Sequence, residues 1–145
     1  MPEWVDRALT SLLTQLGVHF LAPGPRWLAP PWTHAGWGLV VAGSLLAGLS
    51  ARRFLRAGTG VRPFTPATEL VAAGAFRWTR NPMYLGLLTV TVGVAVVLGT
   101  LVPALVPPCF FALLHLRFVR AEERFLRERL GAAYDDYCAR VRRWL

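Results

Sequence analysis

Lysine is absent from this chain, cysteine occurs only twice, and acidic residues number eight against sixteen arginines. Cys109 in an apolar run and Cys138 near the C-terminus are too few and too far apart for a disulfide framework. His19, His34 and His115 stand singly, and no His, Cys, Asp or Glu residues have the spacing of metal ligands. We therefore expect neither structural disulfides nor a metal site.

The arginines flank apolar runs instead of covering an aromatic-rich soluble surface, so nucleic acid is not an expected partner. Residues 52–80 carry six arginines against Glu69, and residues 117–145 carry eight arginines against five acids. In membrane proteins such clusters mark cytoplasmic segments. With 145 residues, 54% of them hydrophobic, and a mean hydropathy of +0.42, we expect one integral membrane domain in a bacterial inner membrane.

The apolar runs predict an all-α integral membrane protein with about four transmembrane helices. Residues 1–51 would hold two of them. The first, residues 8–22, is short and carries polar side chains, so it either spans the membrane or lies in its interface. The second, residues 34–51, is rich in glycine and alanine, which permits close helix packing. Residues 52–80 are expected to form a cytosolic loop, in which Gly58-Thr59-Gly60 is either a turn or a weak signal for ligand binding.

The segment Asn81–Leu116 contains 36 residues without a formal charge. As one helix it would be about 54 Å long, whereas the hydrocarbon core of a bilayer is about 30 Å thick. Residues 81–120 should therefore fold back as a helical hairpin, turning at Gly99-Thr100 with Pro103. We also expect Pro107-Pro108 to kink the second helix and to leave carbonyl groups that neighbours must satisfy.

This hairpin would place two polar clusters on the same membrane face. Arg80 precedes its first helix, and Glu122-Glu123 follows its second. Charged groups near lipid are costly unless they are paired or functional. The alternative is that Arg80 and Tyr84 are interfacial anchors and that the two glutamates only balance neighbouring arginines on a solvated helix face.

The pattern of residues 121–145 predicts cytosolic amphipathic helices that are divided at Gly131. Apolar residues recur there at helical spacing, opposite arginines and acids. We expect this face to lie on an anionic membrane surface. It comprises Leu126, Leu130, Tyr134, Tyr137, Val141 and Trp144.

Residues 60–145 carry a family resemblance in four ordered segments: residues 74–86 (GAFRWTRNPMYLG), 122–126 (EERFL), 130–137 (LGAAYDDY) and 141–144 (VRRW). In this combination the chain resembles the isoprenylcysteine carboxyl methyltransferase and phospholipid methyltransferase family of membrane enzymes. The resemblance implies S-adenosylmethionine as methyl donor, bound on the cytosolic side. Asn81 stands where eukaryotic carboxyl methyltransferases of this type have His, and Phe76 where Tyr is frequent, so the acceptor stays open.

The implied site uses chemistry that suits this donor. An arginine fork binds a carboxylate, a glutamate accepts from ribose hydroxyls or an ammonium, and an aromatic face stabilises a sulfonium. The implied catalytic residues are Arg80, Tyr84 and Glu123. The implied cofactor-binding residues are Arg77, Arg80, Asn81, Pro82, Tyr84, Gly86, Glu122, Glu123, Tyr134 and Tyr137.

The expected acceptor is a lipophilic molecule or lipid with a carboxylate, amine, thiol or hydroxyl group, because the chain offers no soluble domain to enclose a polar acceptor. We expect a cleft open to lipid between helices rich in small residues, such as Gly43, Gly48, Gly86 and Gly93, and the kinked span with Pro107-Pro108. Two other functions stay open: an NADPH-dependent membrane reductase and a non-enzymatic membrane scaffold. The sequence does not specify an oligomeric state.

Overall fold

A computed structural model describes residues 3–56 and 72–145. The predicted all-α class is confirmed, since no strand is formed by these residues. The longer helices are α1 (Glu3–Leu21), α2 (Ala35–Arg56), α3 (Pro82–Leu98), α5 (Val106–Leu113), α6 (Arg120–Leu130) and α7 (Ala132–Arg140). The short elements are η1 (Trp32–His34), η2 (Gly74–Arg77), α4 (Leu101–Ala104) and η3 (Leu114–Val119), the last of which is π-helical.

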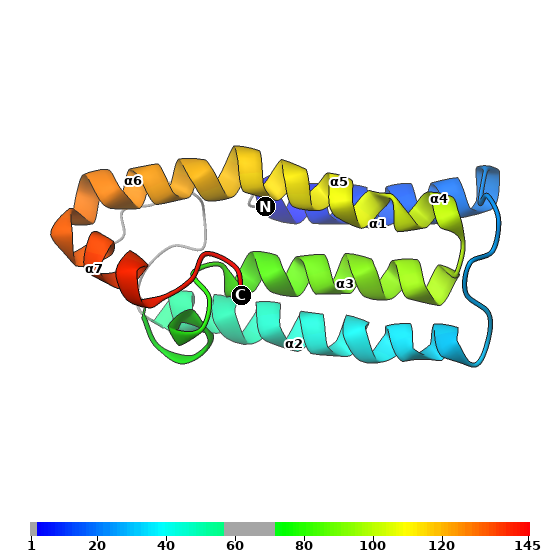
Figure 1. Ribbon diagram of the computed structural model, residues 1–145, viewed down its shortest axis with the longest axis horizontal. Helices are drawn as coiled ribbons and strands as arrows, with labels where there is room; N and C mark the ends of the chain where they lie inside the picture. The colour runs from blue at the N-terminus through cyan, green and yellow to red at the C-terminus, as the bar shows by residue number, and fades with distance from the viewer. Residues whose placement is uncertain (1–2, 57–71) are drawn as a thin grey trace.

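α1, α2 and α3 lie roughly parallel to one another and to a fourth rod, which is formed by the consecutive elements from α4 to α6 (Figure 1). α2 and α3 lie side by side, and α1 packs against α3, α4 and α5. α4, α5, η3 and α6 follow one another along the fourth rod, and α7 folds back from its end. The loop that leads into α3, the C-terminus and α7 therefore meet at one end of the molecule.

Two helical stretches of the described residues are long and apolar enough to cross a membrane, Trp32–Arg53 and Leu101–Leu130. α3 is apolar but shorter, with 17 residues. α1 extends over 19 residues and carries four buried residues on one side. Two candidate spans are thus found, and the four predicted spans stay a prediction.

The second helix is longer than the sequence predicts. We expected it to end at Ala51, before Arg52-Arg53, but α2 continues to Arg56. Arginine is a good helix former, and the side chains of Arg52 and Arg53 are exposed at the helix end, where they reach solvent without ending the helix. Gly58-Thr59-Gly60 lies outside the described residues.

The contact between α2 and α3 depends on reciprocal pairs of glycines. A Cβ atom on Gly43 would lie 2.5 Å from the Gly86 carbonyl oxygen, and one on Gly36 would lie 2.5 Å from that of Gly93. Such backbone approach is possible only without side chains. The expected cleft therefore does not run between these glycines, because the two helices are in direct contact there.

The hairpin turn is confirmed at Gly99, whose left-handed φ of 62° ends α3. Pro103 was predicted in the turn but lies within α4. The predicted interruption of the second helix lies at Leu105, and Pro107-Pro108 follow it in the first turn of α5. Proline is accepted there because the first N–H groups of a helix have no intrahelical partner.

The prediction that neighbours satisfy the freed carbonyls is confirmed by Gln15 of α1. Pro107 has no N–H to donate to the carbonyl of Pro103, four residues before it. The fully buried Gln15 donates from Nε2 to that carbonyl at 3.3 Å and to the Thr91 carbonyl at 2.9 Å. One amide thus links α1 to both helices of the hairpin.

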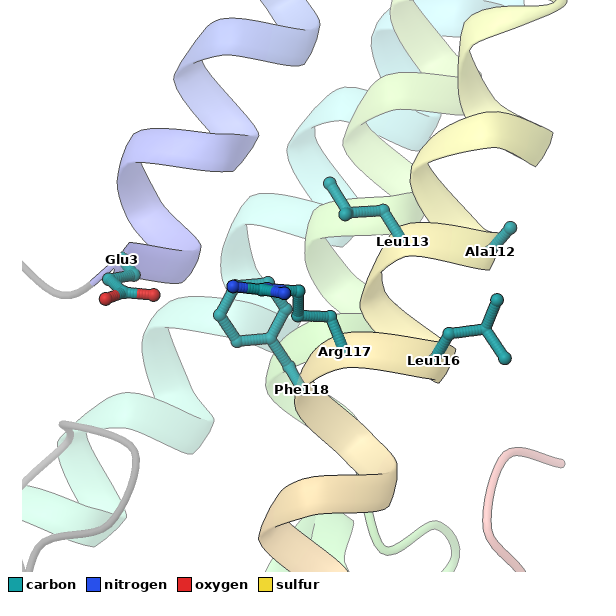
Figure 2. Close-up of a pocket in the computed structure, with 6 residues that line it drawn as sticks. All are labelled: Glu3, Ala112, Leu113, Leu116, Arg117 and Phe118. Carbon is teal, nitrogen blue, oxygen red and sulfur yellow. The ribbon is translucent and has the colours of Figure 1, made fainter.

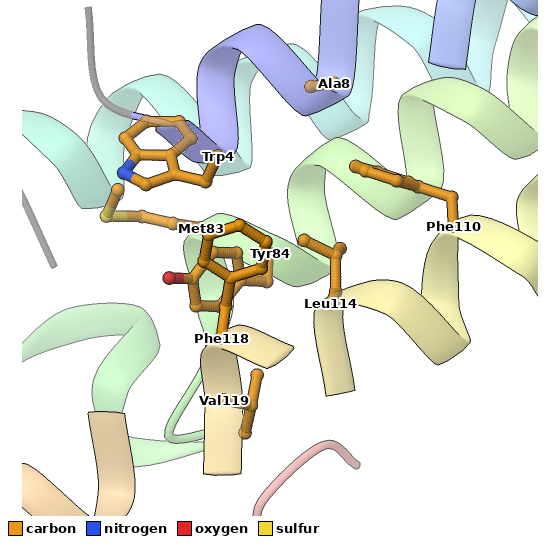
Figure 3. Packing of buried hydrophobic residues seen from close by; sticks show 8 residues of the cluster. All are labelled: Trp4, Ala8, Met83, Tyr84, Phe110, Leu114, Phe118 and Val119. Carbon is orange, nitrogen blue, oxygen red and sulfur yellow. The ribbon is translucent and has the colours of Figure 1, made fainter. Parts of the chain in front are cut away.

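The main buried cluster lies where α1, α3 and the fourth rod meet (Figure 3). The ring of Tyr84 is at its centre and stands perpendicular to that of Trp4, at 6.4 Å between centroids. Its members are Trp4, Ala8, Met83, Tyr84, Phe110, Leu114, Phe118 and Val119.

Gly131 separates α6 from α7, as predicted, with φ at 52°. The apolar face of these helices is directed into the protein: Tyr134, Tyr137 and Val141 are buried, and Leu126 and Leu130 pack against them. Tyr134, Tyr137 and Val141 of this face are therefore covered by the α6–α7 fold-back, and contact of these helices with a membrane surface stays a prediction.

Candidate active site

The helical hairpin brings Arg80 and Glu123 together, as the sequence predicts. Nη1 of Arg80 lies 3.3 Å from Oε1 of Glu123, and both side chains are largely buried, with 12% and 9% exposed. Arg80 stands just before α3, and Glu123 lies in the first turn of α6. A buried ion pair of this kind requires further hydrogen bonds to offset desolvation.

Those further hydrogen bonds come from Arg143, which the site prediction missed. Nε of Arg143 donates to Oε1 of Glu123 at 2.9 Å, and Nη2 donates to Oε2 at 2.6 Å. This bidentate contact raises the pKa of Arg143. The sequence held a signal, because Arg143 lies within the family-like segment 141–144.

The neighbouring carboxylate has a different environment. Tyr84 donates from its hydroxyl to Oε2 of Glu122 at 3.1 Å, and no ion pair involving Glu122 is formed among the described residues. Glu122 is half-buried at the start of α6. The two adjacent glutamates are therefore not equivalent: one is held by two arginines and the other by a tyrosine.

Residues 141–144, which we call the C-terminal strap, run beside the segment that leads into α3. The backbone N–H of Arg80 donates to the Arg142 carbonyl at 2.9 Å. The Thr79 hydroxyl and the Asn81 side-chain amide both donate to the Arg143 carbonyl, at 3.1 and 2.9 Å. The side-chain N–H of Asn81, a predicted ligand of the cofactor, is thus engaged with the strap.

Arg80 also contacts α7 and keeps one donor free. Its Nη1 lies 2.6 Å from Sγ of Cys138. Its Nε is buried and has no hydrogen-bond partner among the described residues. Since buried donors are nearly always satisfied, this N–H is suited to an anionic group of a ligand.

The other predicted site residues lie around this cluster in different ways. Tyr137 is buried and donates to the Phe76 carbonyl at 2.7 Å, while Tyr134 packs beside it. Burial raises the pKa of both phenols, to about 12 for Tyr137. Pro82 is buried in the first turn of α3 and Arg77 is exposed in η2. Gly86 contacts α2, so packing accounts for this glycine.

A lateral opening lies between the start of α1 and η3, with a volume of about 640 Å³ (Figure 2). Arg117 extends across it toward α1, where Glu3 stands at the helix start. A second hollow of about 420 Å³ continues between α1 and α5, and Leu113 lines both. We call the two together the α1–α5 groove. Its wall is mainly apolar, with Arg7, Thr10 and Thr14 from α1.

The groove adjoins the polar cluster through two aromatic side chains. Trp4 follows Glu3 in sequence and Phe118 follows Arg117, and both rings belong to the buried cluster around Tyr84. Within the described part of the chain, no three His, Cys, Asp or Glu residues are grouped closely enough to hold a metal ion. The arrangement thus offers arginine and carboxylate groups at one end of an apolar groove.

Comparison with known families decides the class. The phospholipid methyltransferase family model matches residues 32–133, which include α2, the hairpin, α6 and the glutamate pair. This chain belongs to that family. No curated protein matches it. The resemblance stated from the sequence is thereby confirmed, and the family implies a membrane methyltransferase.

Proposed function

We propose that this protein transfers a methyl group from S-adenosylmethionine to a lipophilic acceptor at the membrane interface. Family membership supports a membrane methyltransferase. The finer proposal rests on Arg80. Its guanidinium group is largely buried and is held by Glu123, and its Nε has no partner among the described residues. This is the donor that a ligand carboxylate needs.

The remaining groups suit the rest of this cofactor. Arg80 would hold the methionyl carboxylate through a charge-assisted hydrogen bond. Glu122, which accepts from the Tyr84 hydroxyl and forms no ion pair among the described residues, would accept from the ammonium or the ribose hydroxyls. The ring of Tyr84 would face the positive sulfur. When bound, the cofactor supplies a methyl group attached to a sulfonium.

The protein's own contribution is binding, alignment and exclusion of water. Trp4 and Phe118 bury the ring of Tyr84 and keep solvent from this side of the site. Methyl transfer is a displacement in line, so alignment in a dry site provides much of the rate enhancement. A carboxylate acceptor needs no general base, whereas an amine, thiol or hydroxyl acceptor would have to lose its proton. Glu122, which forms no ion pair among the described residues, would accept that proton.

The acceptor would bind in the α1–α5 groove. The apolar wall fits a hydrocarbon tail, and Glu3 and Arg117 stand at the end that adjoins Tyr84. A lipid lying there would present its head group at the level of the site. Of the walls expected from the sequence, this location keeps the helix that contains Pro107-Pro108 and leaves out the glycines that pack α2 against α3.

The test is methyl transfer from labelled adenosylmethionine in lipid nanodiscs. Acceptors with equal head groups are compared with and without a long apolar tail, and we expect transfer only to the tailed compounds. Arg80→Ala should weaken binding of adenosylmethionine by calorimetry, since losing one partner of a partly desolvated charge pair costs about 2–5 kcal/mol. Arg142→Ala, an exposed neighbour of Arg143, is the matched control.

Two results would contradict this function. Tighter binding of NADPH than of adenosylmethionine would favour a membrane reductase. Absence of binding by either compound, with Arg80→Ala silent, would favour a scaffold.

We further propose that the site faces the cytoplasm of a bacterial inner membrane, because the arginine-rich segments flank it. The connection from α1 to η1, which contains Gly24, and α7, which contains Asp135, lie at opposite ends of the long axis (Figure 1). Single cysteines at these positions should be labelled from opposite sides of the membrane, with position 135 accessible from the cytoplasm. Labelling of both from one side would contradict the orientation.

A further inference from the structure

We infer that the C-terminal strap is a positioning device for the adenosylmethionine site, and that Arg143 is its key residue. In this assignment Glu123 is also a positioning residue, and Glu122 is the carboxylate left to contact the ligand. The inference rests on the proposed function. The two adjacent glutamates, which the sequence alone does not distinguish, thus have different roles.

The strap is hydrogen-bonded to neighbouring segments along its length. Its backbone accepts from Thr79, Arg80 and Asn81, which immediately precede α3. Thr79 and Arg142 form a parallel bridge between the two segments. Beyond them, Nε1 of Trp144 lies 3.3 Å from Nδ1 of His115 on η3. The strap therefore joins the entry of α3 to the fourth rod.

Both oxygens of the Glu123 carboxylate are bound by arginine side chains. Arg143 occupies both oxygens in a bidentate contact, and Arg80 approaches Oε1 as well. The carboxylate side chain is 9% exposed. A carboxylate fixed on both oxygens by two guanidinium groups has little capacity left for ribose hydroxyls or an ammonium. Glu122 lacks such ion pairs among the described residues.

The position of Glu123 also determines which donor of Arg80 is available to a ligand. Nη1 of Arg80 is held by Glu123 and by Sγ of Cys138, and the buried Nε is left without a partner in the described part of the chain. If Glu123 were not fixed by Arg143, its oxygens would be free to rotate toward this Nε. The strap thus keeps the Arg80 donor available for a ligand carboxylate.

The experiment uses the full chain in nanodiscs with two readouts. Calorimetry measures the affinity for S-adenosylhomocysteine, which has no methyl group to transfer. Maleimide labelling measures the reaction rate of Cys138 in a Cys109→Ser background, because Cys109 is exposed and would react too. Cys138 reports on Arg80 directly through their contact.

We expect Arg143→Ala to weaken S-adenosylhomocysteine binding about tenfold or more, the usual scale for a lost hydrogen bond to a charged group. We also expect it to change the labelling rate of Cys138, because Arg80 would shift relative to Sγ of Cys138. Arg142→Ala should change neither readout, because only its backbone joins the strap contact. Arg143→Lys, which keeps the charge but loses the fork, should fall between, and it serves as the test if the alanine variant does not fold. Glu123→Gln combined with Arg143→Ala should weaken binding no more than the larger single effect.

Wild-type affinity and an unchanged Cys138 rate in both Arg143 variants would overturn the inference. A changed labelling rate with unchanged affinity would also overturn it, since that result describes a purely structural tether. If the wild-type protein binds no adenosyl ligand, the proposed function fails. Cys138 labelling then still tests whether Arg143 controls Arg80.

Discussion

Tyr84 donates a hydrogen bond of 3.1 Å to Glu122, which lies 38 residues further along the chain. The contact joins the first turn of α3 to the first turn of α6. It exists because the chain reverses at Gly99 and returns along α3. The same reversal brings Arg80 to Glu123, so one turn in the middle of an uncharged run assembles the polar cluster.

Tyr84→Phe should fold and lose activity. The ring would keep its contact with Trp4, but Glu122 would lose its hydroxyl donor, at a cost of about 1–3 kcal/mol for an unsatisfied buried partner. Methyl transfer kinetics and thermal unfolding of Tyr84→Phe, Glu122→Gln and the double variant measure the coupling. Strictly additive losses would show that the hydrogen bond has no role in the site.

Gly43→Ala should destabilise the α2–α3 contact. The added Cβ would meet the Gly86 carbonyl oxygen at 2.5 Å, and overpacking of this kind costs about 1–3 kcal/mol. Gly48→Ala on the same helix is the control, because a Cβ there has no atom within 4 Å. Alanine should be neutral or stabilising at that position, by about 0.5–1 kcal/mol. Thermal unfolding in detergent gives both values, and equal stability of the two variants would refute the close contact.

Gln15→Leu should destabilise the bundle and be partly compensated by Pro107→Ala. The leucine removes the donor to the Thr91 and Pro103 carbonyls, and each buried acceptor left unsatisfied costs about 1–3 kcal/mol. Alanine at position 107 supplies a backbone N–H for the Pro103 carbonyl. Denaturant unfolding of the two single variants and the double variant tests this. A double variant as unstable as the sum of both single changes would contradict the role assigned to Gln15.

Stability should fall at alkaline pH through Tyr137. Burial raises the pKa of Tyr137 to about 12, above the value of about 10 in an unfolded chain. Since the neutral phenol is favoured in the folded state, its contribution is fully present below pH 10 and is lost as pH rises from about 10 to 12. Tyr137→Phe should be less stable at neutral pH by about 0.5–1.5 kcal/mol, through loss of the bond to the Phe76 carbonyl.

The measurement for Tyr137 is the thermal midpoint of wild type and variant between pH 7 and pH 12. The difference between the two proteins should shrink above pH 10. Tyr134, whose pKa burial also raises, is present in both proteins, so its titration cancels in the comparison. A difference that stays constant over the whole range would contradict the titration of Tyr137.

Local sequence determined the helices, the reversal and the family. A run of 36 uncharged residues is too long for one crossing, and Gly99 provides the left-handed residue that ends α3, so the hairpin follows from the chain itself. Pro82 and Gly131 likewise mark a helix start and a helix boundary at the predicted positions. Each of these features depends on backbone properties of single residues and their immediate neighbours.

Only the tertiary structure decided how the polar groups are paired. Whether Gly86 contacts a cofactor or another helix depends on what α2 places opposite it, and Gly43 stands there. The apolar residues of α6 and α7 fit a membrane surface equally well until the fold-back buries them. Glu122 and Glu123 are adjacent and chemically identical, yet Arg143 reaches only one of them. These distinctions depend on contacts between residues far apart in sequence, which no local pattern encodes.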